Sequence, residues 1–254
     1  MKKLHRGGNP DGEPLSAGRV EYLEAARQRV RRRRLRRTAI ILAALILVTL
    51  FATGAVGASI ARVKDMVDTV HIALSPAVGW PQQTGLGELT AAQPMSGSFV
   101  AMDEDACAVY SLGGTRLASI QSGYARPALA AGKTRFVLYN RSGNELRVES
   151  RTQNLYSKTL ENSIYLCAMS DTGTLAVATD SADSTARLTV YTPTMSEQLH
   201  WDMTSAQGTP VRMAFAADSR RLAVAAVTSS AGQLQTNLFV LSLAQGDPVQ
   251  LSSG

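Results

Sequence analysis

Short apolar runs recur through the C-terminal two-thirds of the chain, separated by turn-forming residues. Aligning the runs SFVAMD, RFVLYN, TLAVAT and RLAVAAV places Phe99, Phe136, Leu175 and Leu222 in register, at intervals of 37, 39 and 47 residues. Intervals of this size are typical of proteins built from repeated structural units. The pattern predicts four units, at about residues 81–122, 123–161, 162–204 and 205–254.

Each unit divides into four strand-length runs. In the third unit these are YLCAMS, TLAVAT, RLTVYT and QLHWDM, with a turn at Asp171-Thr172-Gly173 between the first two. The second run is apolar at nearly every position, as in a strand that is buried on both faces, whereas the third run alternates. Four such strands in about 40 residues are typical of a propeller blade. We therefore predict an all-β fold, a WD-repeat-like β-propeller with four visible blades, and keep an open β-solenoid or sandwich as the alternative.

β-Propellers close into rings of about four to eight blades. A ring of four is the smallest, and an open arc would leave its inner face and its two end blades in contact with water. We therefore expect the four visible blades to be part of a larger ring. Either the chain is a C-terminally shortened form of a longer one, or another copy closes the arc.

An uncharged apolar run precedes the repeats. It covers residues 38–61, TAIILAALILVTLFATGAVGASIA, and these 24 residues would reach about 36 Å as an α-helix, enough to cross a hydrocarbon core of about 30 Å. Arginines crowd its N-terminal side, so the positive-inside rule places the N-terminus in the cytoplasm and the repeats outside the membrane. The arginines that set this topology and can bind anionic lipid headgroups include Arg31, Arg32, Arg33, Arg34, Arg36 and Arg37.

The run could instead be a cleaved secretory signal, because Val56-Gly57-Ala58 resembles a small-residue cleavage site. A signal peptide has an apolar core of about 7 to 15 residues after a short basic stretch, whereas this run is longer and follows 37 residues. We therefore predict a single-pass signal anchor in the cell membrane. The predicted parts are a basic cytoplasmic segment that is disordered and then helical, a transmembrane helix, a juxtamembrane stalk and the propeller, at residues 1–37, 38–61, 62–80 and 81–254.

The formal charge of +6 is concentrated in the basic segment. Residues 1–37 hold twelve Lys or Arg against four Asp or Glu, whereas the rest of the chain holds fourteen against sixteen. A folded nucleic-acid-binding domain spreads Lys and Arg over one face and interleaves aromatic residues, and the repeats do neither. We therefore expect the basic segment to have a membrane partner and the protein to bind no nucleic acid.

The residues give little support for catalysis or metal binding. The chain has three histidines, His5, His71 and His200, and none of the GxSxG, HExxH, P-loop or Rossmann motifs. Its two cysteines, Cys107 and Cys167, lack metal-ligand spacing and lie in apolar runs, which favours buried thiols over a disulfide. We predict that the protein is not an enzyme and needs no metal or cofactor.

One acidic cluster, Asp103-Glu104-Asp105, lies between two strand-length runs. A Ca²⁺ site usually adds alternating oxygen ligands and a nearby glycine, so a solvated turn is the better interpretation. The alternative function is an envelope enzyme that acts on glycan or peptide, with carboxylates such as Asp103 or Asp105 as acid and base.

A family resemblance rests on residues 122–227. Its most specific parts are SGYARPAL, LYNRSGNELRVESRTQNLYSKTLENSIYLCAMSDTGTLAVATDS, LTVYTPTMSEQLHW and FAADSRRLAVAAV. This stretch resembles an uncharacterised family of Gram-positive bacterial proteins with a domain of unknown function. The resemblance implies an Arg-rich N-terminus, one transmembrane helix and a propeller-like outer domain that extends beyond this chain, and it implies no activity. This chain differs from the family's pattern in the loop 180–187. It matches the pattern at Tyr124, Pro127, Glu149–Arg151 and Trp201.

The remaining class of function is a binding module. Propellers bind ligands and partners with aromatic and arginine side chains carried by loops at the ends of the blades. The binding candidates are Tyr124, Arg141 and Trp201, although such residues more often pack at strand ends. We therefore predict a non-catalytic scaffold or sensor of the cell envelope, in which the propeller binds a protein or wall ligand outside the cell.

Overall fold

The computed structural model describes residues 55–253, and the side chains of residues 63–251. The chain divides into two compact units, Met1–Val56 and Gly57–Gly254, and the described residues belong almost entirely to the second. The predicted cytoplasmic segment with its arginines, and residues 38–54 of the predicted membrane span, lie outside the described residues. The helix α2 (Ala55–Leu74) contains residues 62–74 of the predicted stalk.

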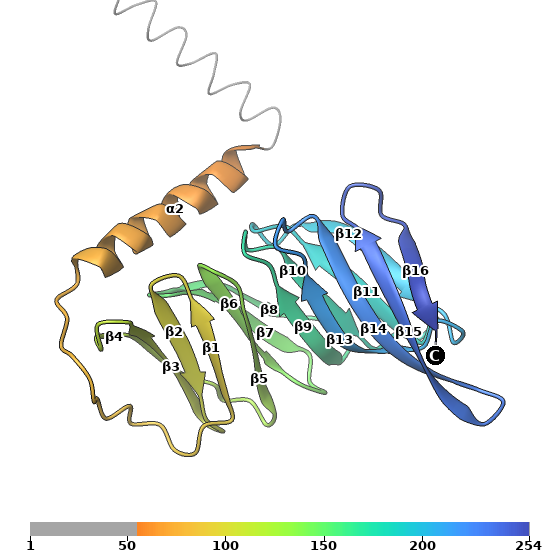
Figure 1. The fold of residues 1–254 in the computed structure, drawn as a ribbon, viewed down its shortest axis with the longest axis horizontal. Helices are drawn as coiled ribbons and strands as arrows, with labels where there is room; N and C mark the ends of the chain where they lie inside the picture. The colour runs from red at the N-terminus through yellow and green to blue at the C-terminus, as the bar shows by residue number, and fades with distance from the viewer. Residues whose placement is uncertain (1–54, 254) are drawn as a thin grey trace, which may run out of the picture. The chain divides into compact units, whose positions relative to one another are not determined.

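Sixteen strands in the described part form four antiparallel sheets, which follow one another along the chain (Figure 1). The first sheet contains β1 (Ala91–Met95), β2 (Ser98–Met102), β3 (Ala106–Ser111) and β4 (Arg116–Gln121). The second contains β5 (Pro127–Ala131), β6 (Arg135–Asn140), β7 (Glu145–Ser150) and β8 (Asn154–Thr159). The third contains β9 (Ile164–Met169), β10 (Leu175–Thr179), β11 (Ala186–Tyr191) and β12 (Glu197–Met203). The fourth contains β13 (Thr209–Phe215), β14 (Arg221–Ser230), β15 (Gln233–Ser242) and β16 (Pro248–Ser253).

Within every sheet the strands pair in the order in which they occur in the sequence, so each sheet is a four-stranded meander. The four residues aligned by the repeat, Phe99, Phe136, Leu175 and Leu222, all fall on the second strand of their sheets. The predicted fold class, an all-β array of four propeller-like blades, is confirmed. The four sheets are therefore blades 1 to 4.

The hydrophobic core lies between neighbouring blades. One cluster joins blades 1 and 2, a second joins blades 2 and 3, and a third joins blades 3 and 4. Strand β10 of blade 3 is buried at every position, because Val177 packs in the cluster with blade 2 and Ala176 in the cluster with blade 4. A strand covered on both faces is a continuous apolar run, which explains the LAVAT sequence.

The two end blades differ in what covers their outer faces. On blade 1, the Trp80 ring centroid lies 5.7 Å from that of Phe99 and 5.9 Å from that of Tyr110, and Tyr110 Oη donates a 2.8 Å hydrogen bond to the Thr84 carbonyl. The segment before β1 therefore covers this blade. On blade 4, burial alternates along β14, because one of its faces packs on blade 3 and no described blade covers the other.

Candidate functional site

Two arginines of blade 2 bind α2. Arg135, the first residue of β6, is 2% exposed, and its Nε lies 3.2 Å from both carboxylate oxygens of Asp65 on α2. Its Nη1 donates a 2.7 Å hydrogen bond to the carbonyl of Pro193, in the β11–β12 turn of blade 3. One side chain therefore links blade 2, blade 3 and the helix.

A glycine of blade 3 leaves room for this arginine. Gly173 lies in the β9–β10 turn that the Asp171-Thr172-Gly173 motif predicts, and its φ is +86°. A Cβ atom added to it would lie 3.0 Å from Cδ of Arg135. Glycine is therefore required here both for the left-handed backbone and for the close approach of the Arg135 stem.

Arg151 follows β7 and is 1% exposed. Its Nη2 donates hydrogen bonds to Thr69 Oγ1 at 2.7 Å and to the Asp65 carbonyl at 3.1 Å, both on α2. Its Nη1 donates to the carbonyl of Ser96, in the β1–β2 turn, at 2.9 Å, so Arg151 also links blade 2 to blade 1. Burial lowers the pKa of the Arg151 guanidinium, and the nearby charges of Asp68 and Asp65 oppose that shift.

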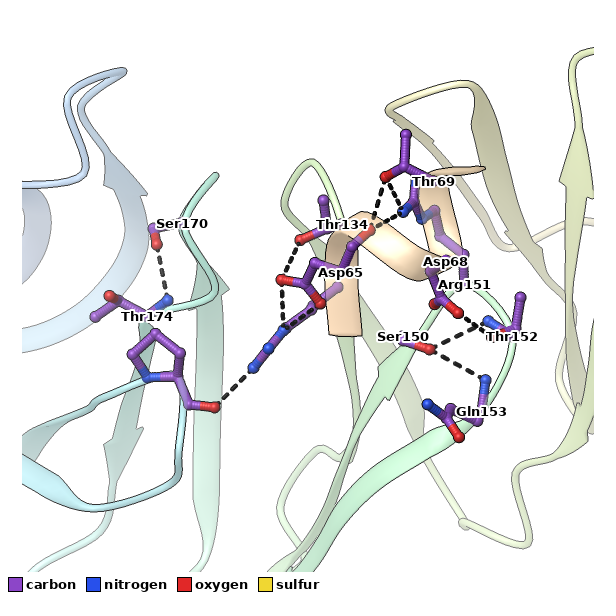
Figure 2. A network of polar contacts seen from close by, with 12 residues as sticks. Asp65, Asp68, Thr69, Thr134, Ser150, Arg151, Thr152, Gln153, Ser170 and Thr174 are labelled. Atoms are coloured by element: carbon purple, nitrogen blue, oxygen red, sulfur yellow. Dashed lines mark hydrogen bonds and ion pairs between the residues drawn. The ribbon is translucent and has the colours of Figure 1, made fainter. Parts of the chain in front are cut away.

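Two threonines complete this network, which Figure 2 shows. Thr134 Oγ1 donates to Asp65 Oδ2 at 3.1 Å, and Thr152 Oγ1 donates to Asp68 Oδ1 at 2.7 Å. The seven residues that form what we call the arginine clasp are Asp65, Asp68, Thr69, Thr134, Arg135, Arg151 and Thr152. A buried charge is tolerated only where partners replace the lost water, so the clasp holds α2 on the blades in one orientation.

The triplet Glu149-Ser150-Arg151, which the family resemblance singles out, supports the clasp. Glu149 is buried, and its carboxylate forms a 2.9 Å ion pair with Arg147 Nη2. Ser150 Oγ accepts a 3.3 Å hydrogen bond from the backbone N–H of Thr152, within the β7–β8 turn. The triplet therefore shapes the turn that directs Arg151 and Thr152 at the helix.

A cavity of about 670 Å³ lies along the first strands of the four blades. A second cavity, of about 380 Å³, shares Leu129, Tyr139 and Arg141 with the first. The polar side chains that line the two cavities are Gln93, Arg126, Tyr139, Arg141, Asp171 and Arg212, with Thr90 at the smaller one. The first strands of the propeller therefore line two adjoining hollows, which we call the inner cavity.

The inner cavity is positively charged. Arg126, Arg141 and Arg212 line it and are exposed. The carboxylate among its lining residues, Asp171, lies 2.8 Å from Lys133 Nζ and is therefore already paired. Guanidinium groups that keep free donors can form bidentate hydrogen bonds with a carboxylate or phosphate. The electrostatics of the cavity therefore favour an anionic ligand.

Among the uncharged polar side chains of the inner cavity, Gln93 links two blades, and Tyr139 and Cys167 stay protonated. The Gln93 amide accepts a 2.6 Å hydrogen bond from Ala131 N–H and donates a 3.1 Å bond to the Leu129 carbonyl, which ties blade 1 to blade 2. Burial raises the pKa of the Tyr139 hydroxyl, and it raises the pKa of the Cys167 thiol well above its usual value. Both groups therefore keep their protons near neutral pH, so neither supplies a nucleophile there.

A third hollow, a groove of about 360 Å³, lies between outer strands of blades 2 and 3. Two pairs of its side chains interact with each other. Lys158 Nζ lies 4.3 Å from the Tyr191 ring centroid, and His200 Nδ1 lies 2.9 Å from Glu197 Oε1. Because these groups already have partners within the groove, the inner cavity is the better candidate for binding an ion.

The structure does not bring the three predicted binding residues together. Arg141 lines both parts of the inner cavity. Tyr124 packs on the cluster between blades 1 and 2, where burial raises its pKa. Trp201 is 8% exposed in the cluster between blades 3 and 4, with its ring centroid 5.2 Å from that of Phe239. Arg141 therefore lies at a candidate site, and a binding role for the other two stays a prediction.

The sequence patterns do not predict the arginine clasp. Arg135 and Asp65 are 70 residues apart, and Thr152 and Asp68 are 84 residues apart, so no local spacing connects them. One local signal exists, because Arg135 opens the otherwise apolar run RFVLYN. A cation at the start of a strand that is buried on both faces must find an acceptor in the folded chain.

In the acidic turn between β2 and β3, the first carboxylate accepts hydrogen bonds from backbone N–H groups. Asp103 accepts hydrogen bonds from the backbone N–H groups of Gly87 at 2.7 Å, Asp105 at 2.9 Å and Ala106 at 2.6 Å. These bonds, that of Gly87 above all, lower the pKa of the Asp103 carboxyl. Within residues 55–253, no group of three His, Cys, Asp or Glu side chains is placed to hold a metal ion.

Both cysteines are free and buried, as the sequence predicts for thiols in apolar strands. Burial raises the pKa of Cys107 to about 12, and the negative charge of Glu149 adds to the shift. A thiol with a raised pKa forms little thiolate and reacts slowly with electrophiles. The prediction of buried, unpaired thiols is therefore confirmed.

The predicted membrane span lies mostly outside the described residues, and α2 includes only its last part, from Ala55 onward. Among the helices of residues 55–253, none combines the length and the apolar composition needed to cross a membrane. The single-pass topology and the lipid contacts of the arginines therefore stay predictions.

Comparison with known proteins identifies a family and similar solved structures. A family of unknown function (DUF5711) has a model that matches residues 80–247 of this chain. No curated protein matches the chain. One matching solved structure is Hsv2 from Kluyveromyces marxianus, with a TM-score of 0.48 and 13% identity over 61% of this chain and 47% of that chain. Hsv2 from Kluyveromyces lactis matches with a TM-score of 0.46 and 11% identity over 61% of this chain and 49% of that chain. The Pan2 WD40 domain from Neurospora crassa matches with a TM-score of 0.45 and 10% identity over 65% of this chain and 51% of that chain. The chain therefore spans about half the length of the solved structures that it matches.

Proposed function

Because this chain belongs to that family of unknown function (DUF5711), we propose its function from the geometry of the inner cavity. The protein is a non-catalytic binding module, and its inner cavity binds a carboxylate-bearing peptide segment of a protein or cell-wall partner. A single-pass N-terminal anchor holds this module on the outer side of the cell membrane, where it serves as a scaffold or sensor of the envelope.

The observation that carries this proposal is the set of three exposed arginines at the inner cavity. Arg126, Arg141 and Arg212 come from blades 2 and 4, and the lining carboxylate, Asp171, is paired with Lys133. An extended acidic segment could place several carboxylates against guanidinium groups along the first strands of the blades. Each such contact is charge-assisted, and the arginine fork adds geometric selectivity for carboxylates over halide ions.

Binding accounts for the cavity better than catalysis does. Its thiol, Cys167, has a raised pKa, and so does its phenol, Tyr139, so neither is an activated nucleophile or a base near neutral pH. The alternative, an envelope enzyme with Asp103 or Asp105 as acid and base, has no comparable support. The Asp103 carboxyl has a lowered pKa and three backbone donors, so it stays ionised at neutral pH and is poorly suited to be a general acid.

The membrane part of the proposal rests on the apolar run 38–61 and on the arginines that precede it. The arginine clasp binds α2, which begins at Ala55 within that run and continues to Leu74. A tether that ends in a clasped helix would limit how the propeller turns relative to the membrane anchor. The topology is tested by adding a membrane-impermeant amine-reactive label to intact cells and mapping modified lysines. Labelling of the exposed Lys133 is expected, and its protection in intact but not lysed cells would contradict the proposed topology.

Ligand binding is tested on the full-length chain in nanodiscs of neutral lipid, with a labelled oligoglutamate peptide as the probe. An oligoglutamine peptide of the same length reports binding that does not depend on carboxylates. The double variant Arg141→Gln/Arg212→Gln is expected to bind oligoglutamate more weakly by up to about thirtyfold, since two exposed charge pairs at roughly 1 kcal/mol or less each contribute at most about 2 kcal/mol.

The matched control is Arg116→Gln/Arg220→Gln, which removes two exposed arginines that do not line the cavity. This control keeps the net charge equal to that of the test variant and leaves the basic N-terminal segment unchanged. Equal affinity of the two double variants for oligoglutamate would overturn the proposal, because binding would then follow net charge rather than the cavity.

A further inference from the structure

Helix α2 presents its polar residues to its own blades. Asp65, Asp68 and Thr69 form the arginine clasp, and Ile72 on the same side of the helix is buried. The contact with the blades is therefore made of one ion pair and several hydrogen bonds, with one buried aliphatic side chain. In an ordinary surface helix, the apolar stripe faces the core and the polar residues face water.

The opposite side of α2 is apolar and exposed. The exposed fractions are 60% for Val63, 68% for Met66, 62% for Val67, 49% for Val70 and 78% for Leu74. These residues follow one another at helical spacing, so they form one stripe along the helix. Contiguous apolar stripes of this kind mark interaction sites, because leaving them in water is unfavourable.

The spacing of the stripe indicates what covers it. Val63, Val67, Val70 and Leu74 are separated by steps of four, three and four residues, and in the sequence Val56 and Ile60 extend the same alternation. This is the heptad pattern of a coiled coil, with a positions at 60, 67 and 74 and d positions at 56, 63 and 70. A repeat of 3.5 residues keeps a seam facing one partner helix over its whole length.

The clasp and the seam use different faces of the helix. In the heptad numbering, Asp65 takes an f position, Asp68 a b position and Thr69 a c position, which lie away from a and d. Both faces can therefore be occupied at once. The clasp also stops α2 from rotating to bury its apolar side against its own blades, since that would break the bonds of Arg135 and Arg151 to Asp65 and Thr69.

We propose that α2 pairs in parallel with α2 of a second copy of this chain, along the seam of Val63, Val67, Val70 and Leu74. Identical helices in register place a against a and d against d, so each copy supplies the complement that the other needs. In the parallel arrangement Met66 of one copy flanks His71 of the other, and no like charges meet among the side chains of residues 63–74.

A lipid surface fits this stripe less well. Helices that lie in a membrane interface carry Lys and Arg on the polar face, where they meet anionic headgroups. The charged side chains of α2 within residues 63–74 are two aspartates, Asp65 and Asp68, which are bound within the clasp, and a single exposed lysine, Lys64. The inference goes beyond the proposed function, because pairing through α2 does not depend on whether the inner cavity binds a ligand.

The test uses the full-length chain in nanodiscs of neutral lipid large enough for two copies. Val70→Cys places a thiol on the seam, and Leu234→Cys places one at an even more exposed apolar position, near the start of β15. Mild oxidation is expected to convert most of the Val70→Cys protein to a covalent dimer and to leave Leu234→Cys and the parent without a covalent crosslink. The buried native thiols, Cys107 and Cys167, serve as the internal background in all three.

A second variant separates the seam from any pairing through the membrane span. Val67→Glu/Val70→Glu places charges at one a and one d position, and it should raise the dissociation constant of the dimer at least tenfold, as measured by energy transfer between labelled copies. The unfolding midpoint should stay near that of the parent, because both side chains are exposed in the single chain. A folded double variant that still dimerises like the parent would overturn the proposal.

The remaining outcomes also decide the question. If Val70→Cys forms no disulfide but a fluorophore on that cysteine is quenched by brominated lipid, the stripe lies on the membrane and the proposal is wrong. If in cells Val70→Cys crosslinks to a different protein and not to itself, the seam serves another partner and the proposal is again wrong. Unchanged oligoglutamate binding by Val67→Glu/Val70→Glu would show that ligand binding at the inner cavity does not depend on pairing through α2.

Discussion

Two groups of arginines in this protein have opposite surroundings. Arg135 and Arg151 of the clasp are buried, and their guanidinium groups donate to carboxylate, hydroxyl and carbonyl oxygens of α2 and the neighbouring blades. Arg141 and Arg212 of the inner cavity are exposed to water. The comparison shows that a buried arginine uses its N–H donors to hold the fold together, whereas an exposed arginine keeps N–H donors that can bind a ligand.

The largest loss of stability is expected when Arg151 is replaced. Arg151→Met removes the donors for Thr69, Asp65 and Ser96 and leaves the Asp68 carboxylate buried without a nearby cation. Breaking a buried charged network from one side costs about 3 to 5 kcal/mol, so the urea unfolding midpoint should fall steeply.

The control for that experiment is Arg116→Met, at an exposed position of β4. An exposed arginine is expected to change the free energy of unfolding by less than about 0.5 kcal/mol. Equal unfolding midpoints for Arg151→Met and Arg116→Met would show that burial does not separate the two groups as argued.

A smaller loss of stability is expected when Thr152 is replaced. Its Oγ1 is the donor to Asp68 Oδ1, and Asp68 Oδ2 has no hydrogen-bond partner among the described residues. Thr152→Val keeps the shape but removes the hydroxyl, and an unsatisfied buried acceptor costs about 1 to 3 kcal/mol. Thr236→Val, at an exposed position of β15, is the matched control. A loss no larger than that of the control would mean that Asp68 finds another partner.

Burial of a thiol between blades 1 and 2 also predicts that stability depends on pH. Cys107 has a pKa of about 12 in the folded protein against an ordinary value of 9.0, because burial and Glu149 disfavour the thiolate. Only the unfolded chain ionises this thiol between those values, so its contribution to stability is complete below about pH 9 and is lost as pH rises above it. The expected slope is about 1.4 kcal/mol per pH unit.

The measurement is the free energy of unfolding of the parent and of Cys107→Ala between pH 7 and pH 11. The variant should lose stability at every pH because of the cavity that it creates, but its alkaline slope should be shallower by one proton. Parallel slopes for the two proteins would mean that Cys107 ionises equally in the folded and unfolded chains.

The smallest effect on stability is expected at Arg141. Arg141→Gln should change the free energy of unfolding by less than about 0.5 kcal/mol, because the side chain is exposed, while it weakens oligoglutamate binding. Arg151→Met at a temperature where it stays folded should show the reverse, with binding retained and stability reduced. A strong loss of stability in Arg141→Gln would place this arginine with the structural group instead.

Local sequence patterns predicted the fold well. Phe99, Phe136, Leu175 and Leu222 mark the second strand of each blade, and turn motifs such as Asp171-Thr172-Gly173 mark where the strands reverse. Both signals depend on neighbours within a few residues, because the side-chain period of a strand and the backbone demands of a turn are local properties. The blades could therefore be counted before their contacts were known.

The candidate site was predicted only in part. Arg141 follows a strand at its loop end, and the structure places it at the inner cavity. Trp201, chosen on similar grounds, is buried against Phe239, because its position on β12 faces blade 4. The sequence could not distinguish these cases, since the direction of a strand-end side chain depends on the neighbouring blade.

The sequence by itself determined the repeated strands and the heptad spacing of α2, because each follows from a period of two or of 3.5 residues. Only the tertiary structure decided which arginines are buried, which line a cavity and which face of α2 remains exposed. The physical reason is that burial of a charge depends on acceptors brought together from distant positions, such as Asp65, which lies 86 residues before Arg151.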